Sequence, residues 1–139
     1  MKFGTKVIHA GIHPDSETGA VMTPIYQTST YAQESPGKHK GYEYARTQNP
    51  TRHVLQTNLA ALENGTAGIC FGSGMAAMDA ILRLLNPGDE IISTNDLYGG
   101  SYRLMTKVYE RYGVKSHFID LNDSRLLKEK INKKTKLIW

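Results

Sequence analysis

The segment with the clearest chemical potential is Phe71-Gly72-Ser73-Gly74-Met75-Ala76-Ala77, in which two glycines precede an apolar helical period. Glycines allow a tight turn that exposes successive N–H groups, and the start of a helix adds partial positive charge. The chain at Ser73, Gly74 and Met75 would therefore hold a phosphate well. Taken alone, the motif equally fits a strand–helix turn without a ligand.

The same glycines also admit the binding of a dinucleotide. Gly72-x-Gly74-x-x-Ala77 matches the dinucleotide fingerprint, and Asp96 lies at about the distance expected for a ribose-binding acid. Against this, the next expected strand ends at Ser93, and a long irregular segment precedes the motif. A nicotinamide-binding Rossmann domain is therefore the alternative hypothesis.

A phenol and a guanidinium are spaced two residues apart in Tyr44-Ala45-Arg46. In an extended chain, Tyr44 and Arg46 point the same way because side chains alternate with period two. Arginine offers a planar fork of donors, so this pair suits a phosphate. If the segment stood alone, a surface pair without a ligand would be the simpler interpretation.

A third candidate lies in Asn95–Arg103, which follows the end of an expected strand. Ligands of parallel sheets bind at such ends. Tyr98 could stack on a flat ring, and Arg103 could bind a carboxylate. If the loop stood alone, packing would be the simpler explanation for Tyr98 and solvation the simpler one for Arg103.

These residues must be positioned by an alternation of helices and strands that begins at Asn49. The pattern favours an α/β domain over residues 49–139, with a mostly parallel sheet and helices on both faces. Cys70 would then be a buried, inert thiol in a strand. The expected elements are a helix capped by Asn49 with Pro50 first, a buried strand Ala67–Phe71, a helix Met75–Leu85, a strand Glu90–Ser93, a helix Ser101–Arg111 closed by Gly113, a strand Val114–Ile119, a short helix from Asp123 or Ser124, and a strand Lys136–Trp139.

Residues 1–48 differ from the rest, because they are rich in Thr, Ser, Gly, Pro and Tyr and show no helical period. Such a segment cannot bury a core of its own, so we expect an extended arm that packs on another domain or a neighbouring subunit. At the other end, the chain stops on the apolar run Leu137-Ile138-Trp139, which is typical of a fragment.

Composition and charge exclude several classes of function. The chain is 40% hydrophobic and 22% charged, and no apolar run approaches the ~20 residues of a membrane span. The net charge of +4 is concentrated in a late lysine cluster without interleaved aromatic residues, so nucleic-acid binding is not expected. With a single cysteine and no signal-like stretch, a reducing cytoplasm is the simplest location, and the scattered histidines predict no metal site.

Taken together and in order, these segments resemble the cysteine/methionine-metabolism family of pyridoxal 5'-phosphate (PLP)-dependent enzymes, the group of cystathionine γ-synthase and γ-lyase. The resemblance implies the N-terminal part of an aspartate aminotransferase-like large domain. It covers nearly the whole chain through Thr5–Gly11, Thr23-Pro24-Ile25-Tyr26, Tyr44-Ala45-Arg46 with Asn49-Pro50-Thr51, Ser73-Gly74-Met75 and Leu97-Tyr98-Gly99-Gly100.

The resemblance implies a role for each matched position. Tyr44 and Arg46 would reach across a subunit interface to the cofactor phosphate of the neighbour, while the backbone at Gly74 and Met75 holds the phosphate from within. Tyr98 would stack on the pyridine ring and assist proton transfer. The working unit would then be a dimer at least, with a homotetramer expected.

Two further positions point to the substrate. Members of the family that act on cystathionine tend to carry an acidic residue and an arginine where this chain has Glu43 and Arg103, which suits the second ammonium and carboxylate of cystathionine. The resemblance thus implies formation or cleavage of a carbon–sulfur bond in cystathionine, with cysteine or activated homoserine as possible partners. No lysine here lies in the Ser-x-Thr-Lys type of setting that binds the cofactor, so we expect the chain to be inactive alone, or at most an oligomerising remnant.

Overall fold

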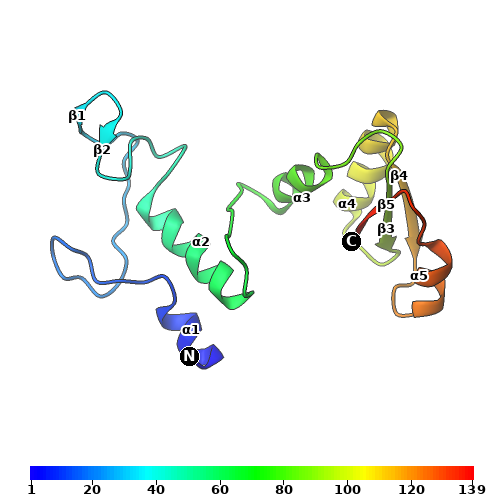
Figure 1. Ribbon diagram of the computed structural model, residues 1–139, viewed down its shortest axis with the longest axis horizontal. Helices are drawn as coiled ribbons and strands as arrows, with labels where there is room; N and C mark the ends of the chain where they lie inside the picture. Colours follow the sequence, from blue (N-terminus) through cyan, green and yellow to red (C-terminus); the bar gives the residue numbers. More distant parts are fainter. The chain divides into compact units, whose positions relative to one another are not determined.

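The computed structural model describes residues 1–139, which form two compact units, Met1–Cys70 and Phe71–Trp139 (Figure 1). This division differs from the boundary expected after residue 48. The helix that follows Asn49 packs on the first helix of the chain and therefore belongs to the N-terminal unit.

The N-terminal unit combines two helices with a small hairpin. Its elements are α1 (Phe3–His9), β1 (Gln33–Ser35), β2 (Lys38–His39) and α2 (Pro50–Leu62), and β1 pairs with β2 in antiparallel orientation. The side-chain amide of Asn58 in α2 joins the two helices, since it donates to the carbonyl oxygens of Lys6, Val7 and Ala10 at the end of α1. The Lys6 carbonyl also accepts from the N–H of Ala10, so the Asn58 side chain adds to the backbone cap at the end of α1.

Asn49 begins α2 as expected and does more than cap it. Its side-chain oxygen accepts from the N–H of Arg52, and its side-chain amide donates to the carbonyl oxygen of Tyr26 at 2.9 Å. The hydroxyl of Thr51 donates to the carbonyl oxygen of Pro24 and accepts from the N–H of Tyr26. The start of α2 thereby fixes the extended segment around Tyr26, which pairs with no strand.

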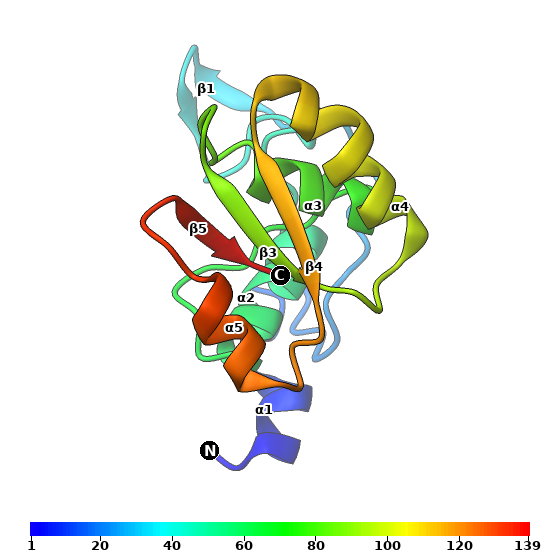
Figure 2. The same ribbon diagram turned by 90° about the vertical axis from the view of Figure 1, so that its right-hand side faces the viewer.

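The C-terminal unit is an α/β layer structure around three parallel strands, with β3 between β4 and β5 (Figure 2). Figure 1 places α3 and α4 on one side of this sheet and α5 on the other. The expected α/β class with a parallel sheet is confirmed. The elements are α3 (Gly74–Leu82), β3 (Glu90–Thr94), α4 (Gly99–Arg103), a π-helical turn η1 (Leu104–Val108), a 3₁₀ turn η2 (Tyr109–Tyr112), β4 (Lys115–Ile119), α5 (Ser124–Lys130) and β5 (Thr135–Ile138).

The core of this unit lies between the sheet and the helices that precede and follow β3. Ile91 faces this core from the central strand, and alternate side chains of β3 point to opposite faces, so Ile92 is buried on the other side. Gly113 ends the helical stretch with a φ of 80°, a conformation that glycine adopts without strain. The buried members of the core cluster are Met78, Leu82, Ile91, Met105, Tyr109 and Val114.

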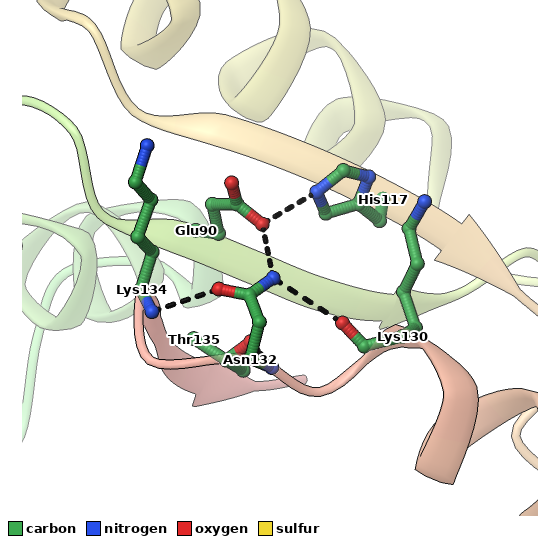
Figure 3. A network of polar contacts seen from close by, with 6 residues as sticks. All are labelled: Glu90, His117, Lys130, Asn132, Lys134 and Thr135. Atoms are coloured by element: carbon green, nitrogen blue, oxygen red, sulfur yellow. Dashed lines mark hydrogen bonds and ion pairs between the residues drawn. The ribbon is translucent and has the colours of Figure 1, made fainter.

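A polar network holds the amino ends of the strands together (Figure 3). The Glu90 carboxylate on β3 accepts from the side-chain amide of Asn132, before β5, and lies 2.9 Å from His117 Nε2 on β4. The hydrogen bond from Asn132 and that from His117 lower the pKa of Glu90, against the opposing effect of burial. One carboxylate therefore links all three strands at the edge opposite their carboxyl ends.

Two expectations for the connection between the units are wrong. Residues 67–71 form no strand, and Ile69 is 74% exposed, because no strand of the chain pairs with them and a lone strand leaves its backbone groups unbonded. Cys70 is accordingly half-buried in an irregular segment and is not enclosed in a strand.

The helix expected over Ser101–Arg111 exists but begins earlier, at Gly99, and changes to a π-helical turn at Leu104.

Candidate functional site

The start of α3 presents unpaired backbone donors to solvent. Ser73 caps the helix, since its hydroxyl oxygen accepts from the N–H of Ala76 at 3.1 Å and its carbonyl oxygen accepts from the N–H of Ala77. The N–H groups of Gly74 and Met75 have no partner in the structure. Nothing lies within 4 Å of the place that a Cβ would take on Gly74, so the approach to these donors is open. The geometry fits an anion such as phosphate.

Tyr98 lies just before α4, at the carboxyl end of β3. Its carbonyl oxygen accepts from the N–H groups of Ser101 and Tyr102, while its side chain is 70% exposed. The ring turns back over Gly100, where an added Cβ would lie 3.0 Å from Tyr98 Cδ1 and 3.1 Å from Met75 Sδ. The structure thus brings Tyr98 beside Met75 and the start of α3, within one unit.

A buried tyrosine, Tyr109, joins α3 to the helical stretch that follows Tyr98. The hydroxyl of Tyr109, in η2, donates to Asp79 of α3, 2.7 Å from Oδ1 and 3.0 Å from the carbonyl oxygen. Burial and the neighbouring carboxylate raise the pKa of Tyr109 to about 12. The hydrogen bonds from Arg83 and Tyr109 lower the pKa of Asp79. This bond therefore joins the element that begins at Gly74 to the element that follows Tyr98.

Tyr44 and Arg46 lie side by side in the N-terminal unit. The Arg46 guanidinium sits 5.0 Å from the centre of the Tyr44 ring, a cation–π arrangement. Tyr44 bridges to Thr30, and the N–H of Ala45 donates to the carbonyl oxygen of Ser29. The extended conformation expected for this segment is wrong beyond Tyr44, because residues 45–47 form a turn in which the N–H groups of Thr47 and Gln48 donate to the carbonyl oxygen of Tyr44. Arg46 is exposed and makes no ion pair, which leaves its donors free for an anion.

Arg52 supports this pair from α2. Its guanidinium donates to the carbonyl oxygens of Ala45 and Thr47 at 3.1 and 2.7 Å. These bonds hold the chain on both sides of Arg46 in place. A shallow hollow of about 400 Å³ borders Tyr44 and Arg46 and is further lined by residues 26–29 and Ala45.

Glu43 and Arg103, the expected substrate-binding residues, are both exposed and form no ion pair. The Arg103 guanidinium turns back towards the start of α4, with Nη1 3.6 Å from the position of a Cβ on Gly99. Glu43 lies in the N-terminal unit, where its carbonyl oxygen accepts from the N–H of Tyr31. Each charge is therefore available to a ligand.

The dinucleotide alternative loses its structural basis. A dinucleotide fold requires a strand directly before the glycine-rich turn, and residues 67–71 form none. Asp96 lies beyond the end of β3 at Thr94 and is exposed. The open start of α3 consequently fits a single phosphate better than a dinucleotide.

Two parts of this site were not expected from the sequence. One is Gly100, whose lack of a side chain leaves room for the Tyr98 ring. A usable signal was present, because two glycines in the first turn of a helix cost stability and indicate a close approach. The other is the Tyr109–Asp79 bond, for which the sequence offers no local signal.

No helix combines the length and apolar character needed to cross a bilayer. The histidine, cysteine and acidic side chains form no cluster of three or more that could hold a metal ion.

Comparison with known proteins agrees with this geometry. Residues 4–139 match the family described as Cys/Met metabolism PLP-dependent enzyme. The chain is 54% identical to a cystathionine beta-lyase of Coxiella burnetii over 97% of its own length and 35% of the relative. It is 50% identical to a cystathionine gamma-lyase of Bacillus subtilis over its full length and 37% of the relative. The chain thus spans about a third of the length of the relatives it matches.

The fold of the chain also matches that of a solved relative. The crystal structure of metB from Corynebacterium glutamicum superposes with a TM-score of 0.94 at 45% identity, covering 100% of this chain and 37% of that one. The parallel sheet with its helices therefore corresponds to the N-terminal part of that structure. With the family matched over residues 4–139, this chain belongs to the Cys/Met metabolism PLP-dependent enzymes.

Proposed function

We propose that this chain forms the cofactor-phosphate and substrate-entry part of a PLP-dependent transsulfuration enzyme that makes or breaks cystathionine. The observation that carries the proposal is the open start of α3, which presents two unpaired N–H groups, while the Met75 side chain and the exposed ring of Tyr98 both lie next to Gly100. The phosphate and the flat pyridine ring are the two parts of PLP that a protein must bind. The family match over residues 4–139 supports the same cofactor.

Different residues bind the phosphate and the ring of PLP. The N–H groups of Gly74 and Met75 bind the phosphate, and the Ser73 hydroxyl, which uses one lone pair to cap α3, donates its hydrogen to it. Tyr98 stacks on the pyridine ring and exchanges a proton with the substrate through its phenol oxygen. When bound, PLP withdraws electrons from the amino acid, which makes the α-proton and the bond to the γ-substituent labile.

Tyr44 and Arg46 complete the phosphate site from a neighbouring copy of the chain. The ring and the guanidinium already lie together, and neither is engaged with an acidic side chain. An arginine fork matches two phosphate oxygens, and the phenol donates to a third. The functional assembly is therefore at least a dimer, in which each site uses residues of both copies.

Glu43 and Arg103 bind the distal end of cystathionine. That end carries an ammonium and a carboxylate, which require an acidic and a guanidinium partner respectively. Both side chains are exposed and free of ion pairs. The two relatives named above carry cystathionine in their names, which supports the same substrate class.

No lysine of residues 1–139 is expected to bond PLP. Such a lysine usually occupies a desolvated pocket, where the neutral amine is favoured. Every lysine of this chain is exposed except Lys6, whose ammonium bonds to Asn64 and to the carbonyl oxygen of Ala61. The chain is therefore expected to bind PLP without catalysing transsulfuration.

Titration of the chain with PLP and with pyridoxal, which lacks the phosphate, tests the proposal. Replacing Arg46 by alanine should weaken PLP binding by about ten- to a hundredfold, because a charge-assisted bond contributes ~1.5–3 kcal/mol. Pyridoxal binding should be unchanged. Arg111→Ala is the matched control, since Arg111 is exposed and unpaired in the other unit. Equal losses in both variants, or an Arg46 effect on pyridoxal, would refute the assignment.

A further inference from the structure

We propose that Gly100 is a positioning residue that seats the Tyr98 ring against the start of α3. The inference rests on the proposed function in one respect, namely that Tyr98 stacks on the cofactor ring. The seat itself is a property of the protein alone. The orientation of the Tyr98 ring therefore requires a glycine at position 100.

The contact geometry carries the inference. A Cβ on Gly100 would lie 3.0 Å from Cδ1 of the Tyr98 ring, closer still to Cε1, and 3.1 Å from Met75 Sδ. Real side chains do not approach each other this closely, so a methyl group there displaces one of its neighbours. The ring, the sulfur and the glycine thus share one small space, and each limits the other two.

The Tyr98 ring is the neighbour that would move. Met75 packs against the hydrophobic core and is held on that side, whereas the Tyr98 ring is 70% exposed and can rotate outwards. The backbone has no reason to give way, because Gly100 lies within α4 and has no positive φ. Alanine is the better helix former, so the substitution favours the helix while it removes the seat.

The adjacent glycine provides a matched control. Gly99 belongs to the same turn of α4, and a Cβ there meets only Arg103 Nη1 at 3.6 Å, an ordinary contact. Gly99→Ala and Gly100→Ala therefore make the same chemical change in neighbouring positions of one helix. Only the second should move Tyr98.

Nuclear Overhauser contacts in the chain without cofactor test the seat directly. The wild type should show contacts from the Tyr98 ring protons to the Gly100 α-protons and to the Met75 methyl group. The contact to Met75 should persist in Gly99→Ala and be lost in Gly100→Ala, while Gly100→Ala remains at least as resistant to urea as the wild type. Absence of the contacts in the wild type, their persistence in Gly100→Ala, or unfolding of that variant would each overturn the inference.

PLP titration of the same variants tests the position of the Tyr98 ring and the proposed function separately. Loss of an aromatic stacking geometry should weaken PLP binding by about two- to tenfold in Gly100→Ala and leave Gly99→Ala unchanged. If the ring moves as expected but no variant or wild type binds PLP, the seat stands and the proposed function fails. If PLP binds equally well to Gly100→Ala while the ring contacts are lost, the seat exists but does not position Tyr98 for the cofactor, and the inference fails.

Discussion

Replacing Tyr109 by phenylalanine should destabilise the C-terminal unit by removing the bond between η2 and α3. The hydroxyl of Tyr109 donates to Asp79 Oδ1 at 2.7 Å from a side chain that is only 7% exposed. A hydrogen bond to an ionised acceptor contributes ~1.5–3 kcal/mol. Asp79 keeps Arg83 and solvent as partners, and phenylalanine fills the same space, so we expect a loss at the lower end of this range, about 1.5–2 kcal/mol.

The pH dependence of this loss follows from the raised pKa. The pKa of Tyr109 rises from 10.0 to about 12 in the folded protein, so the unfolded chain ionises first as the pH increases. The stability contributed by the hydroxyl is therefore complete below pH 10.0 and is lost as the pH rises towards about 12. The difference in the free energy of unfolding between wild type and Tyr109→Phe should shrink over this interval.

Urea denaturation at several pH values, followed by far-ultraviolet circular dichroism, measures both effects. Tyr112→Phe is the control, because Tyr112 is 67% exposed and its hydroxyl has no partner, so its loss should change stability by less than ~0.5 kcal/mol. Equal losses in the two variants would refute the reasoning. A Tyr109→Phe deficit that stays constant up to about pH 12 would refute it as well.

Two further predictions concern the polar contacts of the scaffold. Asn49→Ala should lower the free energy of unfolding by about 1–2 kcal/mol, through the lost helix cap and the lost bond to Tyr26, whereas Gln48→Ala should have little effect in the same urea experiment. Glu90→Gln should be less stable than the wild type at neutral pH. Because the pKa of Glu90 is lowered in the folded state, its contribution is present above pH 4.5 and is lost as the pH falls through that lowered pKa, so acid titration should bring the two proteins together. A difference that persists in strong acid would show that the Glu90 carboxylate does not stabilise the strands.

Several features of the protein follow from short stretches of sequence. The helix start at Asn49 was predicted as observed, and the helix that begins at Gly74 was expected at Met75, because a helix start depends on residues only two or three positions apart. Tyr44 and Arg46 lie side by side as predicted, but through a turn that begins at Tyr44 and not through alternation along an extended chain. The strands β3 and β4 were found from their apolar runs.

Only the tertiary structure decided what depends on distant partners. Residues 67–71 have the composition of a strand, yet a strand exists only where another supplies hydrogen bonds, and none does. The seat of Tyr98 likewise requires Met75 and Gly100 to meet across the fold of α3 and α4. The sequence by itself determined the local caps, the strand-forming runs and the residue types of the phosphate site, because those depend on near neighbours. The fold alone decided which of them lie together, because burial and long-range pairing bring distant segments into contact.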